Sequence, residues 1–256
     1  MEIKQVVVSY DGTTKHLDSV STQFPKGKVT TIIGPNGCGK STLLNVMSRN
    51  HKPFAGQAML ENRDLVEFKP KEFAKKFAIV YQQNDIPQDL TVEKLVMYGR
   101  MPYSSLFQKK TAEDDEAVTW ALSCTKLLEK RGKDLSALSG GERQRVWIAM
   151  ALAQKSEMLC LDEPTTYLDI YYQLELLELV KHLNEQYGLT IVMVLHDINQ
   201  ALRYSDHIVL MKSGTIVAEG IPREVITKEV IKEVYGVNSV FHEDEELGLY
   251  MMPLSI

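Results

Sequence analysis

Short runs of β-branched residues alternate along the chain with longer segments in which apolar residues recur every three or four positions. This alternation is typical of a mainly parallel sheet covered by helices, so the pattern predicts an α/β fold. The predicted strands are Val6–Ser9, Val20–Phe24, Val29–Ile33, Met158–Leu161 and Thr190–Leu195.

The character of the pattern changes twice along the chain. Tight turns are predicted at Asp11–Gly12 and Pro25–Gly27, so part of the N-terminal sheet should be antiparallel. From about Asn84 to Ser156 the strand pattern fades, and Val92–Tyr98 and Glu113–Leu128 carry apolar residues at helical spacing. We therefore expect a helical lobe inserted into the α/β core.

The expected organisation is a single domain over residues 1–256. Its α/β core, with an antiparallel β subdomain, would comprise residues 1–83 and 157–256, and its helical subdomain residues 84–156. A helix is expected before the last predicted strand, where Leu176, Val180 and Leu183 recur at helical spacing, with Gly188 as its stop. The length leaves no room for a second domain of this size.

Composition narrows the class of protein. With 44% apolar and 25% charged residues, the chain is expected to be an ordinary soluble globular protein. Its three widely spaced cysteines predict neither disulfides nor a zinc site, and its net charge of −5 makes nucleic acid an unexpected partner. We expect no signal peptide, and apolar runs such as Ile191–Leu195 are far shorter than the roughly 20 residues of a membrane span.

A glycine-rich segment follows the predicted strand Val29–Ile33 and satisfies G-x-x-x-x-G-K-[ST]. In such a loop, successive N–H groups and the start of the next helix face the phosphates of a nucleotide. Lys40 is expected to neutralise the β- and γ-phosphates, and Ser41 to bind Mg²⁺. The residues expected to hold the nucleotide here are Gly34, Pro35, Asn36, Gly37, Cys38, Gly39, Lys40, Ser41 and Thr42.

Two acidic residues follow the apolar segment Met158–Leu161. Behind a phosphate loop, Asp162 is expected to contribute to the Mg²⁺ site, while Glu163 orients and deprotonates the attacking water. The alternative is a pair of acids that simply opens a loop.

A second glycine-rich helix start lies at Leu138–Arg145, where Ser139, Gly140 and Gly141 precede an apolar helical pattern. Exposed N–H groups and the helix dipole make such a start an anion site. One nucleotide cannot easily use two helix starts of one chain, so this segment is expected to contact the ATP of a partner. The alternative is a simple helix cap at Ser139.

These three motifs, in this order, resemble the nucleotide-binding domain of ABC (ATP-binding-cassette) ATPases. The resemblance covers nearly the whole chain and implies a P-loop NTPase core, ATPase activity and ATP and Mg²⁺ as ligands. It also implies a head-to-tail homodimer in which each ATP lies between one subunit's phosphate loop and the Ser139, Gly140 and Gly141 of the other.

Further positions match the family one at a time. Tyr10 resembles the aromatic residue that stacks on adenine, although a tyrosine packed within a sheet is the alternative. Gln82 resembles the glutamine that senses Mg²⁺ and the attacking water, but Gln83 is adjacent and leaves the register open. Asp169 resembles the aspartate that crosses the dimer interface, or else it caps a helix. His196 resembles the histidine that contacts the γ-phosphate, or else it is structural.

Two residues depart from simple expectation. Cys38 lies beside Lys40 and a helix start, surroundings that favour a thiolate, although a small residue filling a loop position is an equally good interpretation. Glu142 stands where the family more often has glutamine, which would place a carboxylate near a phosphate site unless its side chain points away.

Within the family, Thr91–Tyr103, Glu163–Ile170 and Val194–Ala201 are similar to importers of ferric siderophores, haem and cobalamin, with siderophores ranked first. The resemblance implies a peripheral subunit on the cytoplasmic face of the membrane, a separate permease and, indirectly, a substrate-binding protein. Gln82–Tyr103 would be the permease docking segment, or equally part of the packing of the helical lobe. A soluble, non-transport ABC ATPase is the main alternative, followed by a non-catalytic nucleotide-binding regulator; an exporter cassette remains open.

Overall fold

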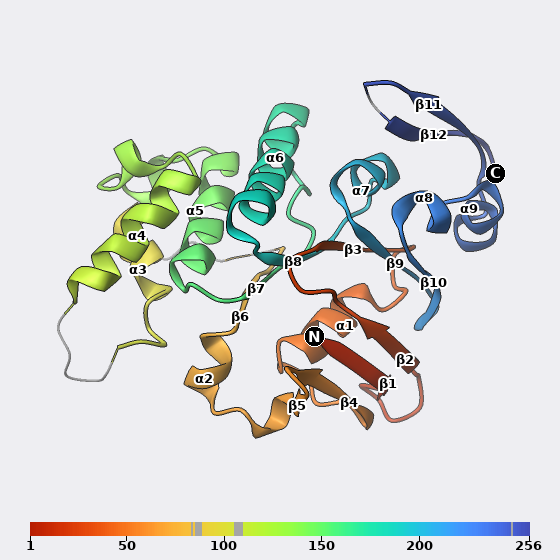
Figure 1. Cartoon of the computed structure of the whole chain (residues 1–256), viewed down its shortest axis with the longest axis horizontal. Helices are drawn as coiled ribbons and strands as arrows, with labels where there is room; N and C mark the ends of the chain where they lie inside the picture. Colours follow the sequence, from red (N-terminus) through yellow and green to blue (C-terminus); the bar gives the residue numbers. More distant parts are fainter. Residues whose placement is uncertain (83, 85–88, 105–109, 247) are drawn as a thin grey trace. The chain divides into compact units, whose positions relative to one another are not determined.

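The computed structural model describes residues 1–82, 84, 89–104, 110–246 and 248–256 (Figure 1). The chain forms two compact units. The first contains Met1–Glu67 and Thr190–Ile256, and the second contains Phe68–Leu189. Together they form the mixture of sheets and helices that the α/β prediction requires.

An antiparallel sheet with the order β2-β1-β4-β5 lies in the first unit. Its strands are β1 (Glu2–Val8), β2 (Leu17–Gln23), β4 (Ala55–Leu60) and β5 (Arg63–Asp64). β1 begins four residues before the predicted Val6, because Ile3 is also buried and Gln5 adopts a positive φ where the register with β2 shifts. This irregularity hides the strand from a strict period-two pattern.

Parallel strands form the second sheet of this unit. β3 (Val29–Ile33) is buried along its whole length and lies between β8 (Thr190–Val194) and β9 (His207–Lys212), parallel to both. β10 (Thr215–Gly220) pairs antiparallel with β9. Burial on both faces explains why β3 and β8 read as continuous apolar or β-branched runs. The prediction for β3 is confirmed, and β8 ends one residue earlier than predicted.

Helices follow these strands in the same unit. α1 (Lys40–Met47) follows β3, where a helix is expected after the glycine-rich loop, and α7 (Ile198–Tyr204) follows β8. The remaining elements are α8 (Pro222–Val225), α9 (Lys228–Tyr235), β11 (Asn238–Asp244) and β12 (Gly248–Ser255), with the short η1 (Leu65–Glu67) after β5. Asn199 of α7 bonds both backbone groups of Met251 and so attaches β12 to α7.

In the second unit, β6 (Phe77–Val80) pairs in parallel with the fully buried β7 (Met158–Leu161). The helices are α2 (Pro70–Ala74), α3 (Val92–Tyr98), α4 (Ala112–Cys124), α5 (Gly140–Ala153) and α6 (Ile170–Tyr187), with short turns η2 (Leu128–Lys130) and η3 (Leu135–Ala137). α4 ends before the predicted Leu128, because the Thr125 hydroxyl bonds the Ala121 carbonyl and Lys126 turns to a positive φ. Gly188 ends α6 in the left-handed conformation, as predicted.

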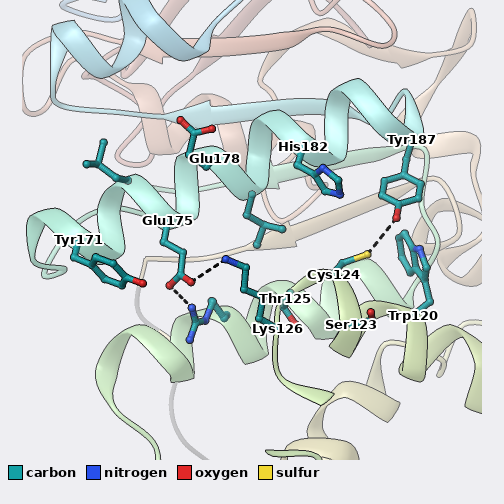
Figure 2. A pocket seen from close by; sticks show the side chains of 13 residues that line it. Trp120, Ser123, Cys124, Thr125, Lys126, Tyr171, Glu175, Glu178, His182 and Tyr187 are labelled. Carbon is teal, nitrogen blue, oxygen red and sulfur yellow. Dashed lines mark hydrogen bonds and ion pairs between the residues drawn. The ribbon is translucent and has the colours of Figure 1, made fainter. Parts of the chain in front are cut away.

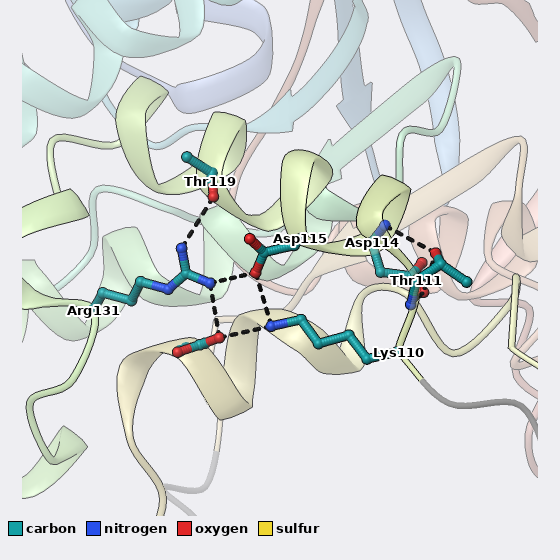
Figure 3. Close-up of polar contacts among 7 residues, drawn as sticks. Lys110, Thr111, Asp114, Asp115, Thr119 and Arg131 are labelled. Atoms are coloured by element: carbon teal, nitrogen blue, oxygen red, sulfur yellow. Dashed lines mark hydrogen bonds and ion pairs between the residues drawn. The ribbon is translucent and has the colours of Figure 1, made fainter.

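Four charged side chains tie α3 to α4 and to the segment that leads toward α5 (Figure 3). Arg131 pairs with Glu93 at 2.8 Å and with Asp115 at 2.5 Å, and Lys110 pairs with the same two carboxylates at 2.9 and 2.8 Å. The Glu93 backbone N–H also donates to the Arg131 carbonyl at 2.9 Å. These contacts connect the start of α3 with the approach to the second glycine-rich helix start.

Among the helices that the structure describes, none is both long enough and apolar enough to cross a lipid bilayer.

Candidate active site

The predicted phosphate loop lies between the end of β3 and the start of α1. Its glycines adopt positive φ values of 153° at Gly34, 76° at Gly37 and 106° at Gly39. A Cβ on Gly34 would lie 2.2 Å from the Met211 carbonyl oxygen, and one on Gly39 would lie 2.7 Å from the His16 carbonyl oxygen. Only glycine fits at these two positions, because the loop backbone packs closely against the carbonyls of Met211 and His16.

Lys40 is the first residue of α1, and its side chain bonds the backbone of this loop. Its side chain is 6% exposed, and its Nζ donates to the carbonyls of Gly34 at 2.8 Å and Pro35 at 3.1 Å. α1 begins with no side chain capping its N–H groups, and Ser41 and Gly37 are exposed. A buried cation beside uncapped N–H groups and an exposed hydroxyl is a suitable cradle for phosphate and a hydrated Mg²⁺.

Cys38 does not have the reactive character that its position suggested. Its side chain is 3% exposed, and burial raises the pKa of its thiol more strongly than nearby Lys40 lowers it. The interpretation that favoured a thiolate is therefore wrong. Cys38 is a small buried residue, and its Sγ would lie 2.7 Å from a Cβ on Gly34.

Tyr10 lies on the phosphate-loop side of the first unit. Its hydroxyl is 3.4 Å from Thr42 Oγ1 in α1, and its ring meets those of His16 and His51 edgewise, with centroids 4.6 and 4.7 Å apart. The ring is 53% exposed. A tyrosine packed inside a sheet would be buried, so the exposed ring supports a role in binding. No pattern in the sequence predicted that His16 and His51 would lie beside Tyr10.

In the second unit, Gln82 contacts Glu163, the second of the two acids that follow β7. Gln82 Nε2 donates to Glu163 Oε2 at 2.7 Å, and the Thr166 hydroxyl lies 3.4 Å from the same oxygen. The Asp162 N–H donates to the Val80 carbonyl, so β7 is held beside β6 up to the acid pair. Glu163 has a φ of 49°, a strained conformation for a residue with a Cβ. Gln83, the alternative to Gln82, lies outside the described residues.

The second glycine-rich start belongs to α5. Ser139 caps this helix: its hydroxyl accepts from the Glu142 N–H at 3.3 Å, and the Glu142 carboxylate accepts from the Ser139 N–H at 3.0 Å. Glu142 also pairs with Lys130, which is the main reason that the pKa of Glu142 is lowered. Its carboxylate is thus occupied within the chain. A Cβ on Gly140 would meet nothing within 4 Å, whereas one on Gly141 would lie 2.8 Å from the Tyr172 ring.

Asp169 and His196 each lie at the start of a helix. Asp169 caps α6, where its carboxylate accepts from the Tyr172 N–H at 3.2 Å. His196 is exposed and comes between Leu195, next after β8, and Asp197, the cap of α7. The cap at Asp169 is the alternative that the sequence left open, and it does not exclude a further contact by the second carboxylate oxygen.

The predicted residues thus fall into separate groups. Within the first unit, the structure brings together the phosphate loop, Thr42 and Tyr10. Within the second, it brings together Gln82 and Glu163 at the end of β7, while the Ser139 helix start and Asp169 begin two other helices. The described residues contain no cluster of three or more histidine, cysteine or acidic side chains that could hold a metal alone. Hydroxyl and carboxylate donors that share a cation with phosphate oxygens suit Mg²⁺, which needs few protein ligands.

A glycine loop between a buried strand and a helix, with a lysine buried inside it, defines a P-loop nucleotide-binding protein. The sequence pattern of the family described as "ABC transporter" matches residues 17–166. The chain belongs to the ABC transporter family, as an ATP-binding cassette whose activity is ATP hydrolysis coupled to transport.

Several relatives share most of their length with this chain. The iron(3+)-hydroxamate import ATP-binding protein FhuC of Bacillus subtilis (strain 168) is 45% identical, over 93% of this chain and 88% of the relative. The ferric enterobactin transport ATP-binding protein FepC of Escherichia coli (strain K12) is 43% identical, over 90% and 85%. The probable siderophore transport system ATP-binding protein YusV of Bacillus subtilis (strain 168) is 47% identical, over 91% and 84%.

Solved structures agree on the fold. A metal-chelate type ABC transporter in an inward-facing conformation matches with a TM-score of 0.85 at 24% identity, covering all of this chain and 96% of that one. A bacterial ABC transporter cassette solved as a dimer matches with a TM-score of 0.75 at 31% identity, covering 87% and 98%. The predicted P-loop NTPase core with sheets and added helices is therefore confirmed.

Proposed function

We propose that this chain hydrolyses ATP to power import of a ferric siderophore, or a closely related iron chelate, through a separate membrane permease. The observation that carries the proposal is the 43 to 47% identity to subunits named for these importers, over 90 to 93% of the chain. Identity of this extent includes the surfaces of a cassette as well as its ATP site. The proposal adds a peripheral position on the cytoplasmic face of the membrane and, indirectly, a substrate-binding protein.

When ATP binds in the proposed reaction, the Lys40 amine leaves the Gly34 and Pro35 carbonyls and donates to oxygens of the β- and γ-phosphates. Its position supports this role, because its amine is already held inside the loop by the Gly34 and Pro35 carbonyls. Ser41, Asp162 and Gln82 would hold Mg²⁺, which when bound neutralises charge on the phosphate oxygens. Tyr10 would stack on the adenine with its exposed ring.

On the water side, we assign Glu163 as the general base that orients and deprotonates the attacking water. The hydrogen bond from Gln82 Nε2 supports this assignment, since it fixes the carboxylate of Glu163 in one orientation. Through the same hydrogen bond, a movement of Gln82 would change the position of the Glu163 carboxylate. His196 would donate to the γ-phosphate.

Two copies of the chain would act head to tail. In each site, Ser139, Gly140 and Gly141 of the second copy would bind the γ-phosphate, and Asp169 would contact the opposite subunit. The open space at Gly140 supports such an approach, because no side chain of the described residues would block a ligand there. The use of the Glu142 carboxylate as a cap supports it too, because the negative charge is engaged elsewhere.

The base assignment is tested by Glu163→Gln, which keeps the shape of the side chain and removes its basicity. We expect ATP turnover to fall by roughly 10² to 10⁴ while ATP binding persists. Thr166→Val serves as the matched control, because it removes only the hydroxyl that lies 3.4 Å from the same Glu163 oxygen. Normal turnover in Glu163→Gln would contradict the assignment.

The transport proposal is tested by co-purification with the permease and reconstitution of the complex in vesicles together with the substrate-binding protein. We expect ferric siderophores to stimulate hydrolysis and to accumulate in the compartment on the same side of the membrane as the cassette, because import moves the cargo toward that side. Stimulation by haem or cobalamin alone would reassign the cargo. Failure to associate with any membrane protein would instead favour a non-transport ABC ATPase.

A further inference from the structure

The loop between β1 and β2, which carries Tyr10, is organised by its own hydrogen bonds. The His16 N–H donates to the Val8 carbonyl at 2.8 Å and closes the loop. Within it, the Asp11 carboxylate accepts from the Thr14 backbone N–H at 2.7 Å and from the Thr14 hydroxyl at 2.8 Å. The backbone on each side of Tyr10 is therefore held by the chain itself.

The side chain of Tyr10 has less polar support than its backbone. It is half exposed, and its hydroxyl lies 3.4 Å from Thr42 Oγ1, close to the limit for a hydrogen bond. A half-exposed side chain with one long hydrogen bond keeps rotamer freedom, and ordering it when a ligand binds costs affinity. Contacts that fix the ring in advance therefore strengthen the binding of a base that stacks on it.

His16 provides one such contact. Its ring centroid lies 4.6 Å from that of Tyr10, and the two rings cross at 67°. Its Nδ1 lies 3.1 Å from the Thr14 carbonyl oxygen, and because a carbonyl can only accept, Nδ1 carries the hydrogen. The His16 carbonyl oxygen is the atom that would lie 2.7 Å from a Cβ on Gly39. His16 thus contacts Tyr10 with its ring and packs against the phosphate loop with its backbone.

His51 provides a second contact, from the segment that follows α1. Its ring centroid lies 4.7 Å from that of Tyr10, and the two rings cross at 63°. The His51 N–H donates to the Asn45 carbonyl in α1 at 3.0 Å. Thr42, which the Tyr10 hydroxyl approaches, belongs to the same helix. Two contacts therefore join the Tyr10 ring to the helix that follows the phosphate loop, one direct and one through His51.

We propose that His16 and His51 are positioning residues for ATP binding, whose rings hold Tyr10 in the orientation in which it stacks on adenine. The inference rests on the proposed role of Tyr10. Edgewise contacts between aromatic rings are favourable, and both histidines are only partly exposed, so the contacts are partly shielded from water. Because both histidines also contact the phosphate loop or its helix, they fix the place of the base relative to the phosphates.

The test compares ATP with inorganic tripolyphosphate, which has the phosphates without the base, by calorimetric titration of the full chain in the presence of Mg²⁺. We expect His16→Ala and His51→Ala each to weaken ATP about three- to tenfold, the cost of ordering one side chain, and to leave tripolyphosphate unchanged. Equal weakening of the two ligands, or unchanged ATP binding, would overturn the proposal. If the wild-type chain binds neither ligand, the proposed nucleotide site itself fails.

Steady-state hydrolysis separates positioning from a general loss of structure. In His51→Ala we expect the KM for ATP to rise about three- to tenfold while kcat stays within about twofold of wild type, because the contact acts on binding of the base. His51→Phe keeps a ring beside Tyr10 and should restore most of the wild-type KM. A fall in kcat at unchanged KM, or a KM in His51→Phe as high as in His51→Ala, would contradict the proposal.

A double-mutant cycle asks whether His51 acts through Tyr10. In a Tyr10→Ala background, His51→Ala should cause no further loss of ATP affinity, because the ring that it holds is gone. A further loss as large as in the wild-type background would mean that His51 acts on the nucleotide independently of Tyr10.

His182→Ala is the matched control. The His182 ring also meets a half-exposed tyrosine edgewise, because its centroid lies 6.0 Å from that of Tyr187 and the rings cross at 86°. Both residues line a cavity of about 790 Å³ in the second unit, which none of the residues predicted to bind ATP lines (Figure 2). We expect ATP affinity to stay at the wild-type value in His182→Ala. A loss equal to that in His51→Ala would attribute both losses to stability and overturn the proposal.

Discussion

Two glycine-rich helix starts, the phosphate loop at Gly34–Ser41 and the start of α5 at Ser139–Gly141, look alike in sequence and are stabilised in different ways. The phosphate loop is fixed by backbone fit, since two of its glycines lie against carbonyl oxygens, and its helix has no side-chain cap. The start of α5 has a full capping box between Ser139 and Glu142.

This difference indicates which start depends on a ligand. At α1, no side chain caps the first N–H groups, so we expect a bound phosphate to complete their hydrogen bonds. At α5, the cap already satisfies two N–H groups, so only the positions at Gly140 and Gly141 remain to approach a nucleotide. A primary binding site and a secondary clamp would be expected to differ in this way.

The comparison is tested most strongly by Gly34→Ala. Its Cβ would lie 2.2 Å from the Met211 carbonyl oxygen, so we expect ATP affinity to fall roughly a hundredfold or more, corresponding to about 3 kcal/mol of overpacking. Titration with a fluorescent ATP analogue measures the loss.

Gly37→Ala is the matched control for this change. Its Cβ would meet nothing within 4 Å, so only backbone strain of roughly 1 to 2 kcal/mol applies. Equal losses in the two variants would show that close packing does not define the loop.

Ser139→Ala addresses the second helix start. Removal of this cap should lower the free energy of unfolding by about 1 kcal/mol and should also reduce ATP turnover, because the first turn of α5 frays. Urea unfolding and steady-state hydrolysis measure the two effects.

Thr111→Ala, which removes the capping box of α4, is the control for Ser139→Ala. We expect a similar loss of stability with little change in turnover. If turnover falls equally in both variants, Ser139 affects hydrolysis only through the stability of the folded chain.

Low pH should weaken the ion pairs that Glu93 forms with Arg131 and Lys110 in the segment that leads to α5. Hydrogen bonds from Arg131 and then Lys110 lower the pKa of Glu93 from its usual value of 4.5 to about 2. A group with a lowered pKa in the folded state contributes stability above its unfolded pKa and loses it as the pH falls toward its folded pKa. The contribution of Glu93 is therefore complete above pH 4.5 and disappears between about pH 4.5 and 2.

Glu93→Gln isolates this effect from the other acids of the cluster. The stability difference between wild type and Glu93→Gln, followed by thermal unfolding, should shrink as the pH is lowered through this interval. A difference that stays constant with pH would show that the ion pairs of Glu93 contribute nothing to folding.

Glu142→Gln should have the smallest effect. A glutamine oxygen can still accept from the Ser139 N–H, and only the ion pair with Lys130 is lost, which is worth about 0 to 1 kcal/mol near a surface. Turnover should stay within about twofold of wild type, whereas Glu142→Ala, which also loses the cap, should behave like Ser139→Ala. A large increase in turnover in Glu142→Gln would mean that the carboxylate does oppose phosphate.

Local patterns predicted much of the fold. β3, β7 and β8 are runs of apolar or β-branched residues because they are buried on both faces, and Gly188 ends α6 because glycine adopts the left-handed conformation without strain. Boundaries were less predictable. The bulge at Gln5 hid the start of β1, and the Thr125 side chain ended α4 before its apolar pattern ended.

The sequence by itself determined the class of this protein, because the chemistry of phosphate binding requires particular residues at fixed short spacings, as in the segment from Gly34 to Ser41. Only the tertiary structure decided which side chains meet across the chain. It buried Cys38, turned the Glu142 carboxylate toward Lys130 and Ser139, joined Gln82 to Glu163 and left a cavity beside Trp120. Such contacts depend on packing between residues far apart in sequence, and no local pattern records them.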